Sequence, residues 1–130
     1  MIENDDDDRL LTKETFQQEW PTAEIEFVRA EELAGRLPVI DPPQLILLTM
    51  NARPYTAIGL IETIRATKGC ELTPIVVLSE SARQDEIAAC YAAGASSFIK
   101  KPASYADTLF KIKTFINYWG HTVELPTVAE

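Results

Sequence analysis

Polar residues whose chemistry suits a cation and a phosphoryl group follow four short apolar runs of this sequence. Carboxylate and amide oxygens are ligands for a divalent cation. A lysine ammonium and a hydroxyl group can contact the oxygens of a phosphoryl group. In parallel sheets the carboxyl ends of neighbouring strands meet at one edge, where sites form. In chain order, the residues are Glu3, Asn4 and Asp5; Thr49 and Asn51; Ser79 and Glu80; and Lys101.

The elements that would position these residues alternate between strands and helices. Residues 45–50 and 75–78 are nearly continuous apolar runs, which are typical of strands buried on both faces. Apolar residues at helical spacing predict a helix over 57–67, and Gly94 ends another helix over 84–93. The remaining expected elements are a helix over 9–20, an edge strand over 24–28, a short helix over 31–36, a strand over 97–101 and a helix over 104–119.

This alternation predicts an α/β fold, with a parallel sheet and helices on both of its faces. The length of 130 residues fits a single domain over 1–130, in which 104–126 form the last helix and a tail. Only Met1 and Ile2 precede the acidic residues. The first strand is therefore either very short or lacks residues upstream.

Composition and charge exclude several classes of function. The net charge of -8 should repel nucleic acid and anionic lipid, so we expect neither as a partner. Apolar residues make up 46% of the chain, yet no run of 18 apolar residues predicts a membrane span. Cys70 and Cys90 fit no metal spacing, and their low number without an export signal predicts reduced thiols in the cytoplasm.

Three segments, together with the acidic residues that precede them, resemble the receiver domain of two-component response regulators, the CheY-like family. They read Pro-Gln-Leu-Ile-Leu-Leu at 43–48, Pro-Ile-Val-Val-Leu-Ser at 74–79 and Ala-Gly-Ala-Ser-Ser-Phe-Ile-Lys-Lys-Pro at 93–102. The resemblance implies a flavodoxin-like (βα)5 doubly wound parallel sheet. Residues 7–11 and 118–126 are also similar to stand-alone receivers of the phytochrome-associated type.

The resemblance also implies a role for each pocket residue. Thr49 stands at the phosphoacceptor position, where the family has an aspartate, and a threonine cannot form the acyl phosphate. Ser79 is the switch hydroxyl and Lys101 is the lysine that binds phosphoryl oxygens. Phe98 lies at the aromatic switch position, and Glu80 places a new carboxylate beside the pocket.

The acidic pair of the family falls on Glu3-Asn4 or on Asn4-Asp5, and one acid is lost in either alignment. We therefore expect no required cofactor, and at most a weak Mg²⁺ site. Its candidate ligands are Glu3, Asn4, Asp5 and Asn51.

Each of these roles has a simpler structural alternative. The acidic run 5–8 can cap the first helix and interact favourably with its dipole. Ser79 can hydrogen-bond to nearby backbone. Lys101 can pair with an acidic-loop carboxylate or with Glu80, and Phe98 can be an ordinary packed aromatic residue.

The last helix carries more aromatic residues than one buried face needs. Its predicted buried face consists of Tyr105, Leu109, Ile112, Ile116 and Trp119. Extra aromatic residues on a terminal helix indicate a surface for a histidine kinase, another signalling protein or a second copy of the chain. Alternatively, the tail 120–126 folds back and covers them. The candidate interface residues are Phe110, Phe115, Tyr118 and Trp119.

We therefore expect an atypical single-domain response regulator, or pseudo-receiver. It would act in bacterial signal transduction through protein–protein interaction, without phosphorylation at Thr49, and would not be an enzyme. The alternative is a conventional phosphorelay receiver that uses a surrogate carboxylate, such as Asp5 or Glu80. An α/β enzyme ranks last, because no combination of nucleophile, base and orienting group is recognisable.

Overall fold

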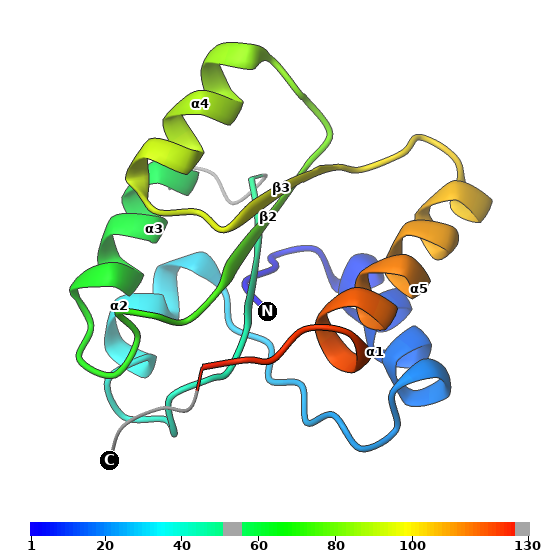
Figure 1. Cartoon of the computed structure of the whole chain (residues 1–130), viewed down its shortest axis with the longest axis horizontal. Coiled ribbons are helices and arrows are strands. Elements are labelled where there is room, and N and C mark those ends of the chain that lie inside the picture. Colours follow the sequence, from blue (N-terminus) through cyan, green and yellow to red (C-terminus); the bar gives the residue numbers. More distant parts are fainter. Residues whose placement is uncertain (51–55, 127–130) are drawn as a thin grey trace.

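The computed structural model describes residues 1–50 and 56–126, which form helices packed on a small parallel sheet (Figure 1). The sheet order is β1-β2-β3, and both pairs of strands are parallel. The elements are α1 (Asp6–Glu19), η1 (Ala30–Glu32), α2 (Leu33–Arg36), β1 (Ile46–Thr49), α3 (Ala57–Ala66), β2 (Ile75–Ser79), α4 (Gln84–Ala93), β3 (Ser97–Lys100) and α5 (Tyr105–His121).

The order of pairing continues beyond β1 through two isolated bridges. Ile2 pairs in parallel with Leu48 on one side and with Val28 on the other. The backbone order across the molecule is thus Val28, Ile2, β1, β2 and β3, with single residues at the first two positions. The α/β parallel architecture is confirmed, whereas only three strands form within the described residues.

The edge strand predicted over 24–28 is reduced to the bridge at Val28. One reason lies in the hydrogen bonds of this segment, because the Phe27 carbonyl accepts from the Arg36 guanidinium instead of from a neighbouring strand. The Val28 amide donates to the Met1 carbonyl, and the Glu3 amide donates to the Val28 carbonyl. The alternating pattern included the residue that pairs, Val28, but it predicted a longer strand than the structure has.

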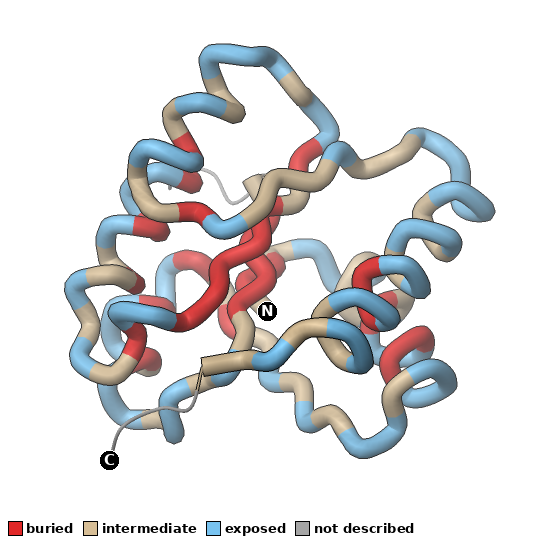
Figure 2. The backbone as a smooth tube through the Cα atoms, in the orientation of Figure 1, coloured by how far each residue is buried: buried red, intermediate tan, exposed pale blue. Residues whose placement is uncertain are grey.

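Helices cover both faces of the sheet because alternate residues of each strand point to opposite sides. On one face, Leu48 and Val77 pack into a core with α2, α3 and α4. On the other face, Leu47 and Val76 pack against Phe16 of α1 and against α5. Figure 2 shows the buried residues concentrated along the sheet and on the inner sides of the helices.

Helix ends follow the capping residues of the sequence. α1 begins at Asp6, three residues earlier than predicted, because the Asp5 side chain accepts from the Asp8 amide at 2.9 Å and caps the helix. The helix predicted over 84–93 is confirmed at both ends. It stops at Gly94, which adopts a φ of 118° that side chains other than glycine rarely adopt.

The aromatic residues of α5 are distributed differently from the prediction. Tyr105, assigned to the buried face, is 68% exposed, whereas Phe115, assigned to the interface, is buried at 6%. The Phe115 ring lies 6.4 Å from the Phe16 ring of α1. Phe115 is therefore a core residue, because α1 packs against that side of α5.

Within 1–50 and 56–126, no helix is both long and apolar enough to cross a membrane.

Candidate functional site

The described polar residues named from the sequence lie near the carboxyl ends of the strands, as expected for a parallel sheet. Thr49 ends β1 and Ser79 ends β2. The Lys101 amide donates to the Ser79 carbonyl at 2.7 Å, which fixes Lys101 beside the end of β2. Glu3 and Asn4 follow Ile2 on the other side of β1, whereas Asn51 lies outside the described residues.

Thr49 is buried and links β1 to the segment that carries Glu3. Its hydroxyl lies 3.0 Å from the Ile2 carbonyl oxygen and 3.1 Å from Oε2 of Glu3. A single hydroxyl proton is shared between these two acceptors. At 1% exposure, Thr49 presents almost no surface to solvent, and its oxygen serves the internal hydrogen-bond network.

Glu3 is a carboxyl group held inside the protein at 3% exposure. Its Oε2 accepts from the amides of Asn4 at 3.0 Å and Asp5 at 3.3 Å, as well as from Thr49. The other oxygen, Oε1, has no hydrogen-bond partner among the described residues. Burial raises the pKa of the Glu3 carboxyl, although the hydrogen bond from the Asp5 amide and the charge of Lys101 act in the opposite direction.

Lys101 pairs with Asp8 across the site. The Lys101 Nζ lies 2.8 Å from an Asp8 carboxylate oxygen, and the two side chains are 17% and 40% exposed. Burial alone would lower the pKa of Lys101, but the hydrogen bond and charge of Asp8, together with the charges of Glu3 and Glu80, raise it overall. The partner of Lys101 is thus a residue of the acidic run, which the structure places in the first turn of α1. Glu80 is exposed.

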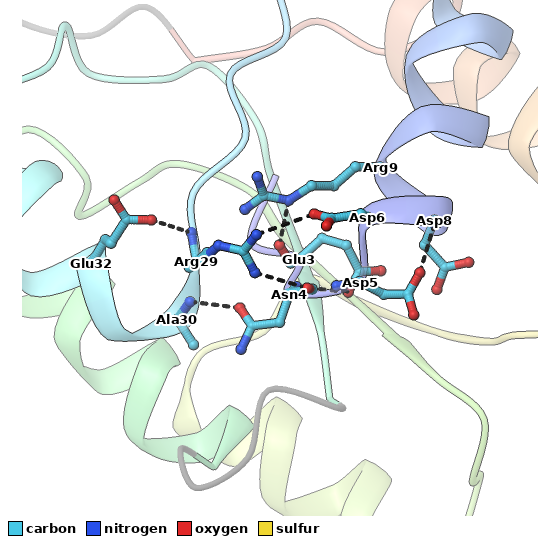
Figure 3. A network of polar contacts seen from close by, with 9 residues as sticks. All are labelled: Glu3, Asn4, Asp5, Asp6, Asp8, Arg9, Arg29, Ala30 and Glu32. Carbon is cyan, nitrogen blue, oxygen red and sulfur yellow. Dashed lines mark hydrogen bonds and ion pairs between the residues drawn. The ribbon is translucent and has the colours of Figure 1, made fainter.

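A second cation, Arg29, also contacts the acidic segment (Figure 3). Its Nη1 donates to the Asn4 carbonyl at 3.0 Å, and its Nη2 donates to an Asp6 carboxylate oxygen at 3.1 Å. The next amide, that of Ala30, donates to the Asn4 side-chain oxygen at 3.0 Å. Sequence reasoning missed Arg29, because no motif marks it and its partners lie more than twenty residues away in the chain.

Arg9 completes the set of cations around the acidic residues. Its Nε donates to the Glu3 carbonyl at 2.7 Å, and its guanidinium lies 5.6 Å from the centre of the Phe27 ring. Arg9 therefore holds the backbone of Glu3 in place. The Glu3 carboxyl group itself accepts hydrogen bonds from Thr49 and from the amides of Asn4 and Asp5.

The described members of the candidate Mg²⁺ set do not converge on one point. The Asn4 side chain is turned to Ala30, and the Asp5 carboxylate caps α1 through the Asp8 amide. Within residues 1–50 and 56–126, no group of three or more acidic, histidine or cysteine side chains is arranged to hold a metal ion. The described residues of the candidate set, Glu3, Asn4 and Asp5, are not arranged to hold the cation that the resemblance implies.

The remaining pocket residues have ordinary local roles. Ser79 is buried, and its Oγ accepts from the Ser81 amide at 3.1 Å, which is a local hydrogen bond typical of serine. Phe98 is partly buried and packs against the core that includes α3 and α4.

A cavity of about 60 Å³ lies between α1, α5 and the sheet. Glu3, Asp8 and Lys101 line one part of it. Most of the remaining lining is apolar and includes Leu11, Phe16, Leu47, Leu78, Ile99, Ile112 and Phe115. The ion pair of Lys101 and Asp8 thus borders a largely apolar space.

No family model matches this chain. Two curated proteins are similar to part of it. The probable methanogenesis regulatory protein FilR2 of Methanothrix harundinacea is 24% identical over 97 residues, which are 75% of this chain and 60% of that protein. Response regulator Rcp1 of Synechocystis is 26% identical over 84 residues, which are 65% of this chain and 57% of that protein. The chain thus spans less than two thirds of the length of these relatives.

Solved structures match the fold over almost the whole chain. The Mn²⁺-bound form of response regulator Rcp1 has a TM-score of 0.80 at 22% identity, covering 97% of this chain and 96% of that chain. The phosphorylated cyanobacterial phytochrome response regulator RcpA has a TM-score of 0.82 at 24% identity, covering 97% and 95%. A Pseudomonas aeruginosa receiver domain with magnesium in its active site cleft, that of sensor histidine kinase PA1611, has a TM-score of 0.67 at 16% identity, covering 89% and 93%.

This chain therefore has the fold of response regulator receiver domains, a parallel α/β sheet covered by helices on both faces. The matched proteins are named as signalling proteins and not as metabolic enzymes, which agrees with the expectation that this chain is not an enzyme.

Proposed function

We propose that this chain is an atypical receiver that acts in two-component signal transduction by binding another protein, without phosphorylation at position 49. The observation that carries the proposal is the buried Thr49 at the end of β1, hydrogen-bonded to Glu3 and to the Ile2 carbonyl. A receiver phosphoacceptor must be a carboxylate that can form an acyl phosphate, and Thr49 is a hydroxyl already used within the fold.

The pairing of Lys101 supports the same proposal. In a phosphorylated receiver the lysine would contact a phosphoryl oxygen. Here the Lys101 ammonium is bound to Asp8 in a partly buried pair. Ser79, the other switch group, accepts from the Ser81 amide. Both groups that would read a phosphoryl group therefore have internal partners.

The binding surface that we propose lies on the outer side of α5. Phe110 is 69% exposed and Tyr118 is 51% exposed, so both rings are available to a partner. Trp119 is partly buried, and its ring lies edge-on to Tyr118 at 5.3 Å between centroids. Phe115 is excluded from this surface because it is buried against α1. The occupant would be a histidine kinase, another signalling protein or a second copy of the chain in the cytoplasm.

The alternative is a conventional receiver that is phosphorylated on a surrogate carboxylate. Of the two candidates, Asp5 caps α1. Glu80 is exposed directly after β2, and so it is the better candidate.

Phosphotransfer from a kinase distinguishes the two functions. The chain is incubated with a purified, autophosphorylated histidine kinase and Mg²⁺, and acid-labile phosphate on the chain is measured. We expect the kinase to keep its phosphate. Label that appears on the wild-type chain and disappears in Glu80→Gln would support the alternative.

A further inference from the structure

We propose that Arg29 is a residue that excludes divalent cations from the acidic residues at the ends of the strands. Solved structures of this fold include an Mn²⁺-bound response regulator and a receiver domain with magnesium in its active site cleft. The proposal goes beyond signalling by protein binding. It can be tested without a phosphodonor or a partner.

The Arg29 side chain occupies two oxygen atoms that a cation would need. Its guanidinium donates to the Asn4 carbonyl and to the Asp6 carboxylate, at 3.0 and 3.1 Å. Both acceptors are hard oxygens of the kind that Mg²⁺ and Mn²⁺ prefer. A cation that approached them would have to displace the guanidinium.

The segment that carries Arg29 also fixes the position of Asn4. The Ala30 amide binds the Asn4 side-chain oxygen, so Asn4 is held through both its backbone and its side chain (Figure 3). A Glu32 carboxylate oxygen accepts from the Arg29 amide at 3.2 Å and fixes the start of η1. Arg29 is therefore held by its own short helical turn and does not depend on the ion pair with Asp6 alone.

Cations of the chain itself contact the acidic residues at this end of the sheet. The contacts of Glu3, Asp6 and Asp8 include three cations, because Arg9 binds the Glu3 backbone, Arg29 binds Asp6 and Lys101 binds Asp8. A divalent cation would gain little by neutralising charges that already have partners. Removing the Arg29 side chain would free the Asn4 carbonyl and the Asp6 carboxylate oxygen for a cation.

Arg29 and Asp6 are 38% and 81% exposed, so a cation in solution can reach Asp6 and compete with the guanidinium for its carboxylate. Exposed ion pairs are screened by solvent and are individually weak. Removal of the guanidinium should therefore raise cation affinity by a modest but measurable factor.

Titration with Mn²⁺ tests the proposal. Binding is measured by calorimetry for the wild type, Arg29→Ala and a control, Arg83→Ala. Arg83→Ala makes the same change of charge by removing an exposed pair with Asp85 elsewhere. We expect Arg29→Ala to bind Mn²⁺ roughly fivefold more tightly than the wild type or better, and Arg83→Ala to stay within about twofold of the wild type. Asp6→Asn, which keeps the guanidinium but removes a ligand, should show no gain.

Wild-type affinity equal to that of Arg29→Ala would overturn the proposal, as would an equal gain in Arg83→Ala. Circular dichroism establishes that each variant is folded. If Arg29→Ala does not fold, Arg29→Gln takes its place, because the amide can still donate to the Asn4 carbonyl while the charge is gone. No gain of Mn²⁺ affinity in folded Arg29→Gln would equally overturn the proposal.

Discussion

The ion pair between Lys101 and Asp8 is partly enclosed and, among the described residues, is the least exposed pair of opposite charges. Its nitrogen and oxygen lie 2.8 Å apart, and the lysine side chain is only 17% exposed. Removing one member of such a pair leaves the other charge partly desolvated and without its partner. The contact joins the end of β3 to the first turn of α1, so it should contribute to stability.

We predict that Lys101→Ala lowers the free energy of unfolding by about 1–2 kcal/mol, between the values typical of exposed and buried pairs. Lys113→Ala is the matched control, because Lys113 pairs with Glu19 at 3.5 Å and is 48% exposed. Its loss should stay below about 0.5 kcal/mol. Urea unfolding of the three proteins measures both differences. Equal losses in the two variants would show that the Lys101 pair has no special role.

Glu3 gives a prediction about pH. Burial raises the pKa of its carboxyl, so the folded protein retains a proton that the unfolded chain releases above the ordinary value. The stability contributed by the neutral form is therefore present at acidic pH and is lost as the pH rises.

We predict that the wild type loses more stability than Glu3→Gln as the pH rises above about 4.5, the ordinary pKa of the carboxyl. Glu62→Gln, on the exposed side of α3, is the control and should follow the wild type. Urea unfolding at several pH values provides the measurement. Parallel pH profiles for the wild type and Glu3→Gln would refute the prediction.

At the level of residues, the sequence predicted groups that directly follow strands. Thr49, Ser79 and Lys101 were located because apolar runs mark where strands end, and an acidic partner for Lys101 was foreseen. Arg29 was not found, because its contacts join segments distant in the chain and depend on how the segment after Val28 returns past the acidic residues. No local pattern encodes such a contact.

Among the elements, α5 shows where a periodic pattern is insufficient. The pattern placed Ile112 and Ile116 on the inner side, where they contribute to the core. It could not show which neighbouring helix packs there. Phe16 of α1 lies against Phe115 and moves the centre of the buried face toward that residue. Tyr105, in the first turn, remains exposed.

We predict that Phe115→Ala lowers the free energy of unfolding by about 3 kcal/mol or more, because it removes a buried aromatic ring and leaves a cavity. Phe110→Ala, on the same helix, should change it by less than about 0.5 kcal/mol. Phe110 is 69% exposed, whereas Phe115 is 6% exposed. Thermal or urea unfolding of the two variants measures both changes. A small effect of Phe115→Ala would contradict the packing of α5 on α1.

Two of the strands were predictable from local sequence, whereas the length of the pairing at the other end of the sheet was not. The central strands β1 and β2 were predicted closely, because continuous apolar runs need burial on both faces. The first two positions of the sheet are single bridges. Their length depends on competing hydrogen bonds, such as that from Arg36 to the Phe27 carbonyl, which a residue pattern cannot reveal.

For the whole molecule, the proposed function predicts association that does not depend on a phosphoryl signal. Phe110 and Tyr118 leave two aromatic rings exposed on the last helix. A few aromatic residues often dominate the energy of an interface, and symmetric dimers are the most common assemblies.

We predict that the wild type associates at tens of micromolar in sedimentation experiments, and that the double variant Phe110→Ala/Tyr118→Ala is shifted toward monomer. Tyr91→Ala, which removes an exposed ring from α4, is the control and should behave as the wild type. If wild type and double variant both sediment as monomers, and the variant retains every protein that the wild type captures, the proposed surface is wrong.

The α/β fold with a parallel sheet was predictable from the sequence, because apolar runs and capping residues mark the alternation of strands and helices. Of the five strands predicted, three form within the described residues. The state of the site was less predictable. The sequence showed a missing carboxylate at Thr49. Only the three-dimensional arrangement shows that Lys101, Arg29 and Arg9 provide the positive charge around the acidic residues.

The central claim, that this receiver fold works without phosphorylation at position 49, is tested most directly by intact-mass measurement after incubation with acetyl phosphate and Mg²⁺. Thr49→Asp serves as the comparison, because it restores a carboxylate at the end of β1; we expect only weak labelling of it, since Glu3 and Lys101 retain their internal partners. For the wild type, we expect an unchanged mass. A stable adduct of one phosphoryl group on the wild-type chain would contradict it.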